Sequence, residues 1–116
     1  DAPEAAKTAW AAAGARLIVV TTGASGQLDL GAVMSALGAA GLTRVFCEGG
    51  GMLAAGLLGA DLVDDLAVIT AGMVLGAEGT PAVGAMGIAA LAEAPRFALA
   101  ETRALGGDSL SLWSRG

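Results

Sequence analysis

The sequence has no histidine and a single cysteine, Cys47, among its 116 residues. Without histidine, the usual zinc ligand sets and the Ser-His and Cys-His catalytic arrangements are excluded. One cysteine forms no internal disulfide, which fits a reducing cytoplasm. Aromatic residues make up only 3% of the chain, although 55% of it is hydrophobic, so a core has to be built mainly from Leu, Val and Ala.

Positive charge is also scarce. The chain carries six Lys and Arg residues and a net charge of −5, whereas a nucleic-acid surface needs clustered cations. No uncharged stretch exceeds 14 residues, which is short of the roughly 18 to 20 that span a bilayer. The first residues are acidic and lack the charged-then-apolar order of a secretory leader. We therefore expect a cytoplasmic protein that binds neither nucleic acid nor membrane.

Helix signals occur three times along the chain. Asp1 has the position of an N-cap, Glu4 that of its capping-box partner, and Asp29 that of a second N-cap. Glycine is typical just after a helix end, where the backbone turns left-handed. The three predicted helices run from Asp1 to a stop at Gly14, from Asp29 to a stop at Gly41, and over residues 52–59.

Apolar runs predict five strands, at residues 17–20, 45–47, 66–71, 97–105 and 109–114. The first three alternate with helices, which is typical of βαβ units and a parallel sheet. The last two flank Gly106-Gly107-Asp108 and predict an antiparallel hairpin. The predicted fold class is therefore α/β, with a three-layer, mostly parallel sheet flanked by helices and a C-terminal antiparallel hairpin. We expect a single domain over residues 1–116.

A glycine turn at residues 49–51 follows the predicted strand 45–47 and leads directly into the third helix. Unpaired N–H groups at a helix N-terminus favour anions, and glycine lets a phosphate approach them. The sequence therefore predicts a phosphate site here, with a tight turn as the alternative. Glu48, at the end of the strand, is either a ligand contact, an exposed turn residue or a cap of the following helix.

Gly49, Gly51 and Ala54 also satisfy the spacing of a dinucleotide fingerprint. That fingerprint requires an acidic residue at the end of the next strand, to hold the ribose hydroxyls. The next strand ends in Thr70-Ala71 instead, so a standard Rossmann site is not expected.

Other polar residues have simpler interpretations. The aspartates within residues 61–65 are expected to be solvated loop acids rather than a metal cluster, and no metal is predicted. Cys47 is expected to be buried and inert. Thr21, Thr22 and Ser25 follow another predicted strand. Their hydroxyl groups either contact a ribose or phosphate or belong to an ordinary loop.

Taken together, the motifs resemble a known family. Four motifs occur in the order found in one kind of reductase domain. They are Val45-Phe46-Cys47-Glu48-Gly49-Gly50 with the following leucines, Leu62-Val63-Asp64-Asp65-Leu66, Val74-Leu75-Gly76 and the Gly107-Asp108 hairpin. That domain is the reductase part of the bacterial bifunctional riboflavin-biosynthesis deaminase/reductase proteins. The resemblance covers nearly the whole chain and implies a dihydrofolate-reductase-like fold.

The resemblance also implies a reaction and a set of contacts. The family uses NADPH to reduce 5-amino-6-(5-phosphoribosylamino)uracil, a phosphoribosyl-pyrimidine, to its ribitylamino form. Glu48 would contact the substrate, and the peptide between Gly49 and Gly50 would have an unusual geometry. The cofactor-binding residues would be Gly49, Gly50, Gly51, Met52, Leu53, Ala54, Ala55 and Gly56.

The chain departs from the family pattern at three points. Met52 stands where a hydroxyl residue is common, and Gly72 stands where proline is common. The chain also begins about halfway through the reductase domain, so the catalytic acid is expected to lie in the other half. We therefore expect no reductase turnover from this segment alone, and a homodimer because apolar strand edges would be exposed. The alternatives are a related reductase of another pyrimidine or pterin, and a non-catalytic dimerising α/β module.

Overall fold

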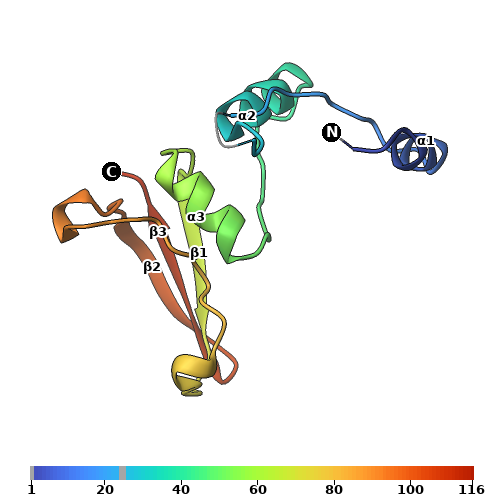
Figure 1. Ribbon diagram of the computed structural model, residues 1–116. Helices are drawn as coiled ribbons and strands as arrows, with labels where there is room; N and C mark the ends of the chain where they lie inside the picture. Colours follow the sequence, from blue (N-terminus) through green and yellow to red (C-terminus); the bar gives the residue numbers. More distant parts are fainter. Residues whose placement is uncertain (1, 24–25) are drawn as a thin grey trace. The chain divides into compact units, whose positions relative to one another are not determined.

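The computed structural model describes residues 2–23 and 26–116 of the chain. By its internal contacts the chain divides into two compact units, residues 1–45 and residues 46–116 (Figure 1). Asp1 and Ser25, which the sequence interpretation used, lie outside the described residues. The single domain over residues 1–116 stays a prediction.

In its described residues the first unit contains two helices, α1 (Glu4–Ala12) and α2 (Leu30–Ala39). The cap predicted for α2 is confirmed, because the Asp29 side chain accepts a hydrogen bond from the backbone N–H of Ala32 at 3.0 Å. No side-chain bond caps α1, whose N-cap is Pro3. The predicted partner in the capping box, Glu4, instead forms an exposed ion pair with Lys7.

Each of the three α-helices among the described residues is followed by a residue in the left-handed backbone region. Gly14 has a φ of 84° after α1, and Gly41 has a φ of 88° after α2, which confirms both predicted stops. The third helix, α3 (Gly51–Gly59), ends with Asp61 at a φ of 59°. In each case the following residue donates a backbone hydrogen bond into the last turn, as Leu62 does to Leu57 at 3.0 Å. This geometry satisfies carbonyl groups that the helix leaves unpaired.

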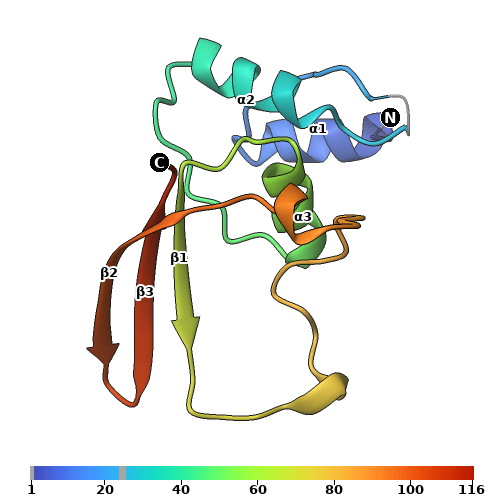
Figure 2. The same cartoon turned by 90° about the vertical axis from the view of Figure 1, so that its left-hand side faces the viewer.

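The second unit contains a three-stranded antiparallel sheet in the order β1-β3-β2 (Figure 2). Its strands are β1 (Asp65–Thr70), β2 (Ala98–Leu105) and β3 (Asp108–Ser114). The predicted hairpin of β2 and β3 is confirmed, with Leu105 opposite Asp108 across the turn. Gly106 has a φ of 62°, as a two-residue hairpin turn requires at its first central position.

The mostly parallel, three-layer sheet is not confirmed. Among the described residues, segments 17–20 and 45–47 are not strands, and every strand pair in the sheet is antiparallel. A short apolar run specifies extended backbone but not the strand that it pairs with. β1 was predicted correctly as a strand, but it takes β3 as its antiparallel neighbour, in a register that places Ala67 opposite Leu112.

A long connection joins β1 to β2 and contains two 3₁₀ turns, η1 (Gly76–Glu78) and η2 (Leu91–Glu93). The Glu93 carboxylate accepts backbone hydrogen bonds from Ala89 and Ala90, which orders the second turn. Among the described residues, only Ala55 and Leu58 of α3 are buried hydrophobic side chains. No helix in the described part of the chain is both long and apolar enough to cross a membrane.

Candidate functional site

The glycine turn lies in the second unit and leads into α3, as the sequence predicts. Gly50 is the N-cap of α3, with φ −66° and ψ 171°, and no side-chain hydrogen bond caps the helix. The first backbone N–H groups of an α-helix have no partner inside the helix, and together they carry a partial positive charge. An anion that reached Gly50 would therefore meet main-chain donors that no side chain caps.

The two glycines before α3 have different surroundings. A Cβ atom at Gly50 would have open space around it, with nothing within 4 Å. A Cβ atom at Gly49 would lie 2.6 Å from the Leu53 side chain and 3.4 Å from the Cys47 sulfur. Gly49 therefore lets the chain pass close to α3, whereas Gly50 leaves room at the N-terminal start of the helix.

The third glycine of the turn has a structural explanation that the sequence did not reveal. The carbonyl oxygen of Gly51 accepts a hydrogen bond from the backbone N–H of Gly84 at 2.8 Å. A Cβ atom at Gly51 would lie 2.6 Å from the carbonyl oxygen of Pro81. The connection between β1 and β2 thus crosses the first turn of α3 in backbone contact. The spacing of glycines gave no signal for this, because the contacting residues are some thirty positions away.

The remaining predicted contacts differ in exposure. Glu48 is exposed, and the Met52 side chain is 81% exposed. Leu53 lies beside Gly49, and Ala54 and Gly56 are half-buried. Ala55 is buried in the core of the second unit, so its side chain does not face solvent at the turn. The surface available to a ligand therefore comprises Glu48, Gly49, Gly50, Met52 and part of Leu53.

Two expectations about this turn are wrong. Cys47 is exposed rather than buried, because the segment it occupies is not an interior strand. The peptide bond between Gly49 and Gly50 is trans, and neither glycine has a positive φ, so the unusual peptide geometry is absent from this part of the chain. The chain makes this turn with a trans peptide and without a left-handed glycine at residue 49 or 50.

The charge around the turn is one-sided. No Lys or Arg occurs in the sequence between Arg44 and Arg96, whereas Glu48 stands directly before the glycines. This segment consequently offers an anion the hydrogen bonds of main-chain N–H groups and the partial positive charge of the helix start. Thr21 and Thr22 belong to the first unit, where Thr21 accepts a backbone bond from Asp29 and Thr22 pairs with Leu28.

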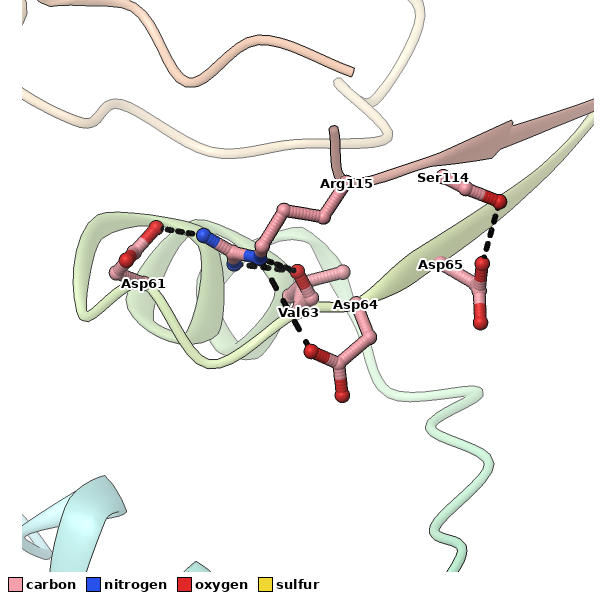
Figure 3. A network of polar contacts seen from close by, with 6 residues as sticks. All are labelled: Asp61, Val63, Asp64, Asp65, Ser114 and Arg115. Carbon is pink, nitrogen blue, oxygen red and sulfur yellow. Dashed lines mark hydrogen bonds and ion pairs between the residues drawn. The ribbon is translucent and has the colours of Figure 1, made fainter. Parts of the chain in front are cut away.

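At the other end of α3, the aspartates expected to be solvated loop acids take part in a polar network around Arg115 (Figure 3). Its guanidinium donates to the carbonyl oxygen of Val63, with Nε at 3.0 Å, and forms an ion pair with Asp61. Asp64 lies 4.0 Å from the same guanidinium. Within the described residues, no group of three or more His, Cys, Asp or Glu side chains is placed to hold a metal ion.

The structure describes an α/β protein in which a glycine turn leads into a helix start that no side chain caps. The chain matches the family described as the RibD C-terminal domain over residues 3–111, and it belongs to that family. It is 39% identical over 83 residues to the riboflavin biosynthesis protein RibD of Escherichia coli (strain K12). The match covers 72% of this chain but only 23% of that relative's length. These findings confirm the resemblance that the ordered motifs predict.

Proposed function

We propose that this chain takes part in the NADPH-dependent reduction of 5-amino-6-(5-phosphoribosylamino)uracil to its ribitylamino form in riboflavin biosynthesis. The observation that carries the proposal is membership of the RibD C-terminal domain family across residues 3–111. The accessible, uncapped start of α3 at Gly50 supports it, because the family's glycine run stands where a helix offers donors to an anion. Family membership also supports a dihydrofolate-reductase-like fold.

The proposed roles follow from what each group offers. The N–H groups at the start of α3 would hold a phosphate of NADPH, and the small residues at 49 and 50 would admit it. The exposed carboxylate of Glu48 would accept hydrogen bonds from substrate N–H or hydroxyl groups. NADPH supplies the hydride, and the protein supplies binding and orientation.

The same charges set a limit on the isolated chain. Recognition of a 2′-phosphate ordinarily uses Arg or Lys, and none occurs between Arg44 and Arg96. We therefore propose that the 116-residue chain binds NADPH weakly and has no turnover with the pyrimidine substrate. Robust NADPH oxidation by the chain alone would contradict this part of the proposal. We also propose that the protein is cytoplasmic and forms a homodimer.

Substitutions at Gly50 test the binding site without disturbing the fold. Gly50→Asn and Gly50→Asp each introduce a good N-cap into open space, and they differ only in charge. Both variants should keep or slightly raise the midpoint of urea unfolding. NADPH titration followed by fluorescence should give the order of affinity wild type, then Gly50→Asn, then Gly50→Asp.

The order arises because a capping side chain competes with the phosphate for the same N–H groups, and a carboxylate also repels it. Gly72→Asn is a matched control, because a Cβ at Gly72 likewise meets nothing within 4 Å and this residue lies outside the turn. Equal affinity in all four proteins would place NADPH elsewhere. No saturable binding by the wild type would contradict the proposed cofactor site.

A further inference from the structure

We infer that Arg115 is a positioning residue that fastens the connection after α3, residues 61–64, to the ends of the sheet strands, and so holds the helix and its N-terminal donor groups in place. The second half of this inference rests on the proposed function, because it takes the start of α3 as the phosphate site. The first half concerns the fold alone. Arg115 lies directly after β3, far along the sequence from α3 and outside the matched residues 3–111.

The contacts of Arg115 join the sheet to the connection that follows α3. Its backbone N–H donates to the carbonyl oxygen of Asp64 at 2.8 Å, which extends the pairing of β3 with β1 by one residue. Its guanidinium donates to the Val63 carbonyl and pairs with Asp61 (Figure 3). The guanidinium also lies over the ring of Phe97, 5.8 Å from its centre, just before β2. One side chain thus links the connection after α3 with the ends of the sheet strands.

Asp61 gives an independent reason to regard this network as more than a surface ion pair. α1 and α2 end with glycine in the left-handed region, but α3 ends there with an aspartate. Asp tolerates this region better than most residues, yet it is less favourable there than glycine. If the position served only to end the helix, glycine would serve it better, as it does at Gly14 and Gly41. The carboxylate of Asp61 has a partner that glycine would not provide, the guanidinium of Arg115.

The magnitudes indicate which contact matters most. Asp61 is 79% exposed and Asp64 is 92% exposed, and exposed ion pairs contribute little to stability. The side chain of Arg115 is 33% exposed, and its bonds to the Val63 carbonyl depend on the planar fork of the guanidinium. The Val63 carbonyl and the Phe97 ring are therefore the main partners, and Asp61 orients the guanidinium between them.

The helix needs such a link because it buries few side chains. Only Ala55 and Leu58 of α3 are buried, and the backbone bond between Gly51 and Gly84 holds its first turn. At its other end α3 lies beside Met86 of the connection between β1 and β2, and Arg115 adds a link to the ends of the sheet strands. Movement at that end would be transmitted along the rigid helix to the N–H groups at its start.

Amide hydrogen exchange on the 116-residue chain tests the first half of the inference without any ligand. Arg115→Gln should raise the exchange rates of the amides of residues 54–62 selectively, while the amides of β2 and β3 away from residue 115 keep theirs. Arg103→Gln is the matched control, because Arg103 also pairs with a carboxylate, that of Glu101, but on β2. Equal acceleration in α3 and in the hairpin, or none in either, would overturn the inference.

NADPH titration of the same variants tests the second half. Arg115→Gln should weaken binding by about two- to thirty-fold, the usual range for a residue that acts through an intervening element. Asp61→Asn should weaken it less, and Arg103→Gln should leave it unchanged. Unchanged affinity in Arg115→Gln, despite selective opening of α3, would overturn the link to the helix start. If the wild type does not bind NADPH, the proposed function and this link both fail, and the exchange result alone decides the role in the fold.

Discussion

Gly84 donates its backbone N–H to the carbonyl oxygen of Gly51, so the connection from β1 to β2 is held against the first turn of α3. This contact divides the three glycines of the turn by role. Gly51 is required by a close approach of two backbones, whereas a Cβ atom at Gly50 would meet nothing within 4 Å. The three glycines resemble a single phosphate motif in the sequence. In the structure they have different roles, because Gly51 is needed for packing and Gly50 stands at the uncapped start of α3.

Gly51→Ala should destabilise the second unit by about 1–3 kcal/mol, because its methyl group would lie 2.6 Å from the Pro81 carbonyl oxygen. Gly59→Ala adds the same methyl group to the same helix, with only the end of Met86 nearby at 4.0 Å. That control should be stabilising by up to about 1 kcal/mol, because alanine favours a helix more than glycine does. Urea unfolding of both variants checks the comparison, and equal shifts would show that the crossing is not tight.

The helices were predictable because their signals are local. Asp29, Gly14 and Gly41 act within one turn of the chain that they cap or end, so sequence spacing alone locates them. The hairpin was predictable for the same reason, since its turn joins neighbouring strands. The partner of β1 was not, because β3 lies some forty residues further on and an apolar run does not specify its neighbour.

The same distinction applies to the candidate site. The glycine turn and the helix after it were visible in the sequence, but the crossing of Gly51 by residues 81–84 was not. The Arg115 network was also missed, because it joins residues more than fifty positions apart. Its one sequence signal was an aspartate, Asp61, at a helix end where the other two helices use glycine.

Cys47 should react with a thiol reagent such as Ellman's reagent in the native protein, at a rate close to that of the urea-unfolded chain. The reason is its exposure on a segment that is not an interior strand. Stopped-flow absorbance with and without urea measures both rates. Protection of the native thiol by several orders of magnitude would restore the buried strand that the sequence first indicated.

The two glycines of the hairpin turn should respond differently to alanine. Gly106→Ala places a side chain at a φ of 62° and should cost about 1–2 kcal/mol. Gly107→Ala has open space and no positive φ, so its effect should stay within about 0.5 kcal/mol. Thermal unfolding followed by circular dichroism compares them. Matching losses would mean that both central residues need the left-handed region.

Asp29→Ala should reduce the stability of α2 by about 0.5–2 kcal/mol, because it removes the side chain that accepts from the Ala32 N–H. Asp29→Ser retains a capping oxygen and should recover most of that loss. Far-ultraviolet circular dichroism during urea unfolding reports the helical content of both. Indistinguishable curves for the two variants would show that the cap contributes nothing measurable to α2.

The proposed homodimer is best tested at β1, because the two edge strands of the sheet differ. β2 carries a bulge near Ala100 and the charged pair Glu101–Arg103, both of which discourage pairing with another strand. β1 has neither feature, and Ile69 on it is 60% exposed. Ile69→Lys should therefore shift the chain to monomer in sedimentation velocity, whereas Leu99→Lys on β2 should leave association intact. A wild-type chain that sediments as a monomer at high concentration would remove the dimer, and dissociation by Leu99→Lys alone would assign it to the opposite edge.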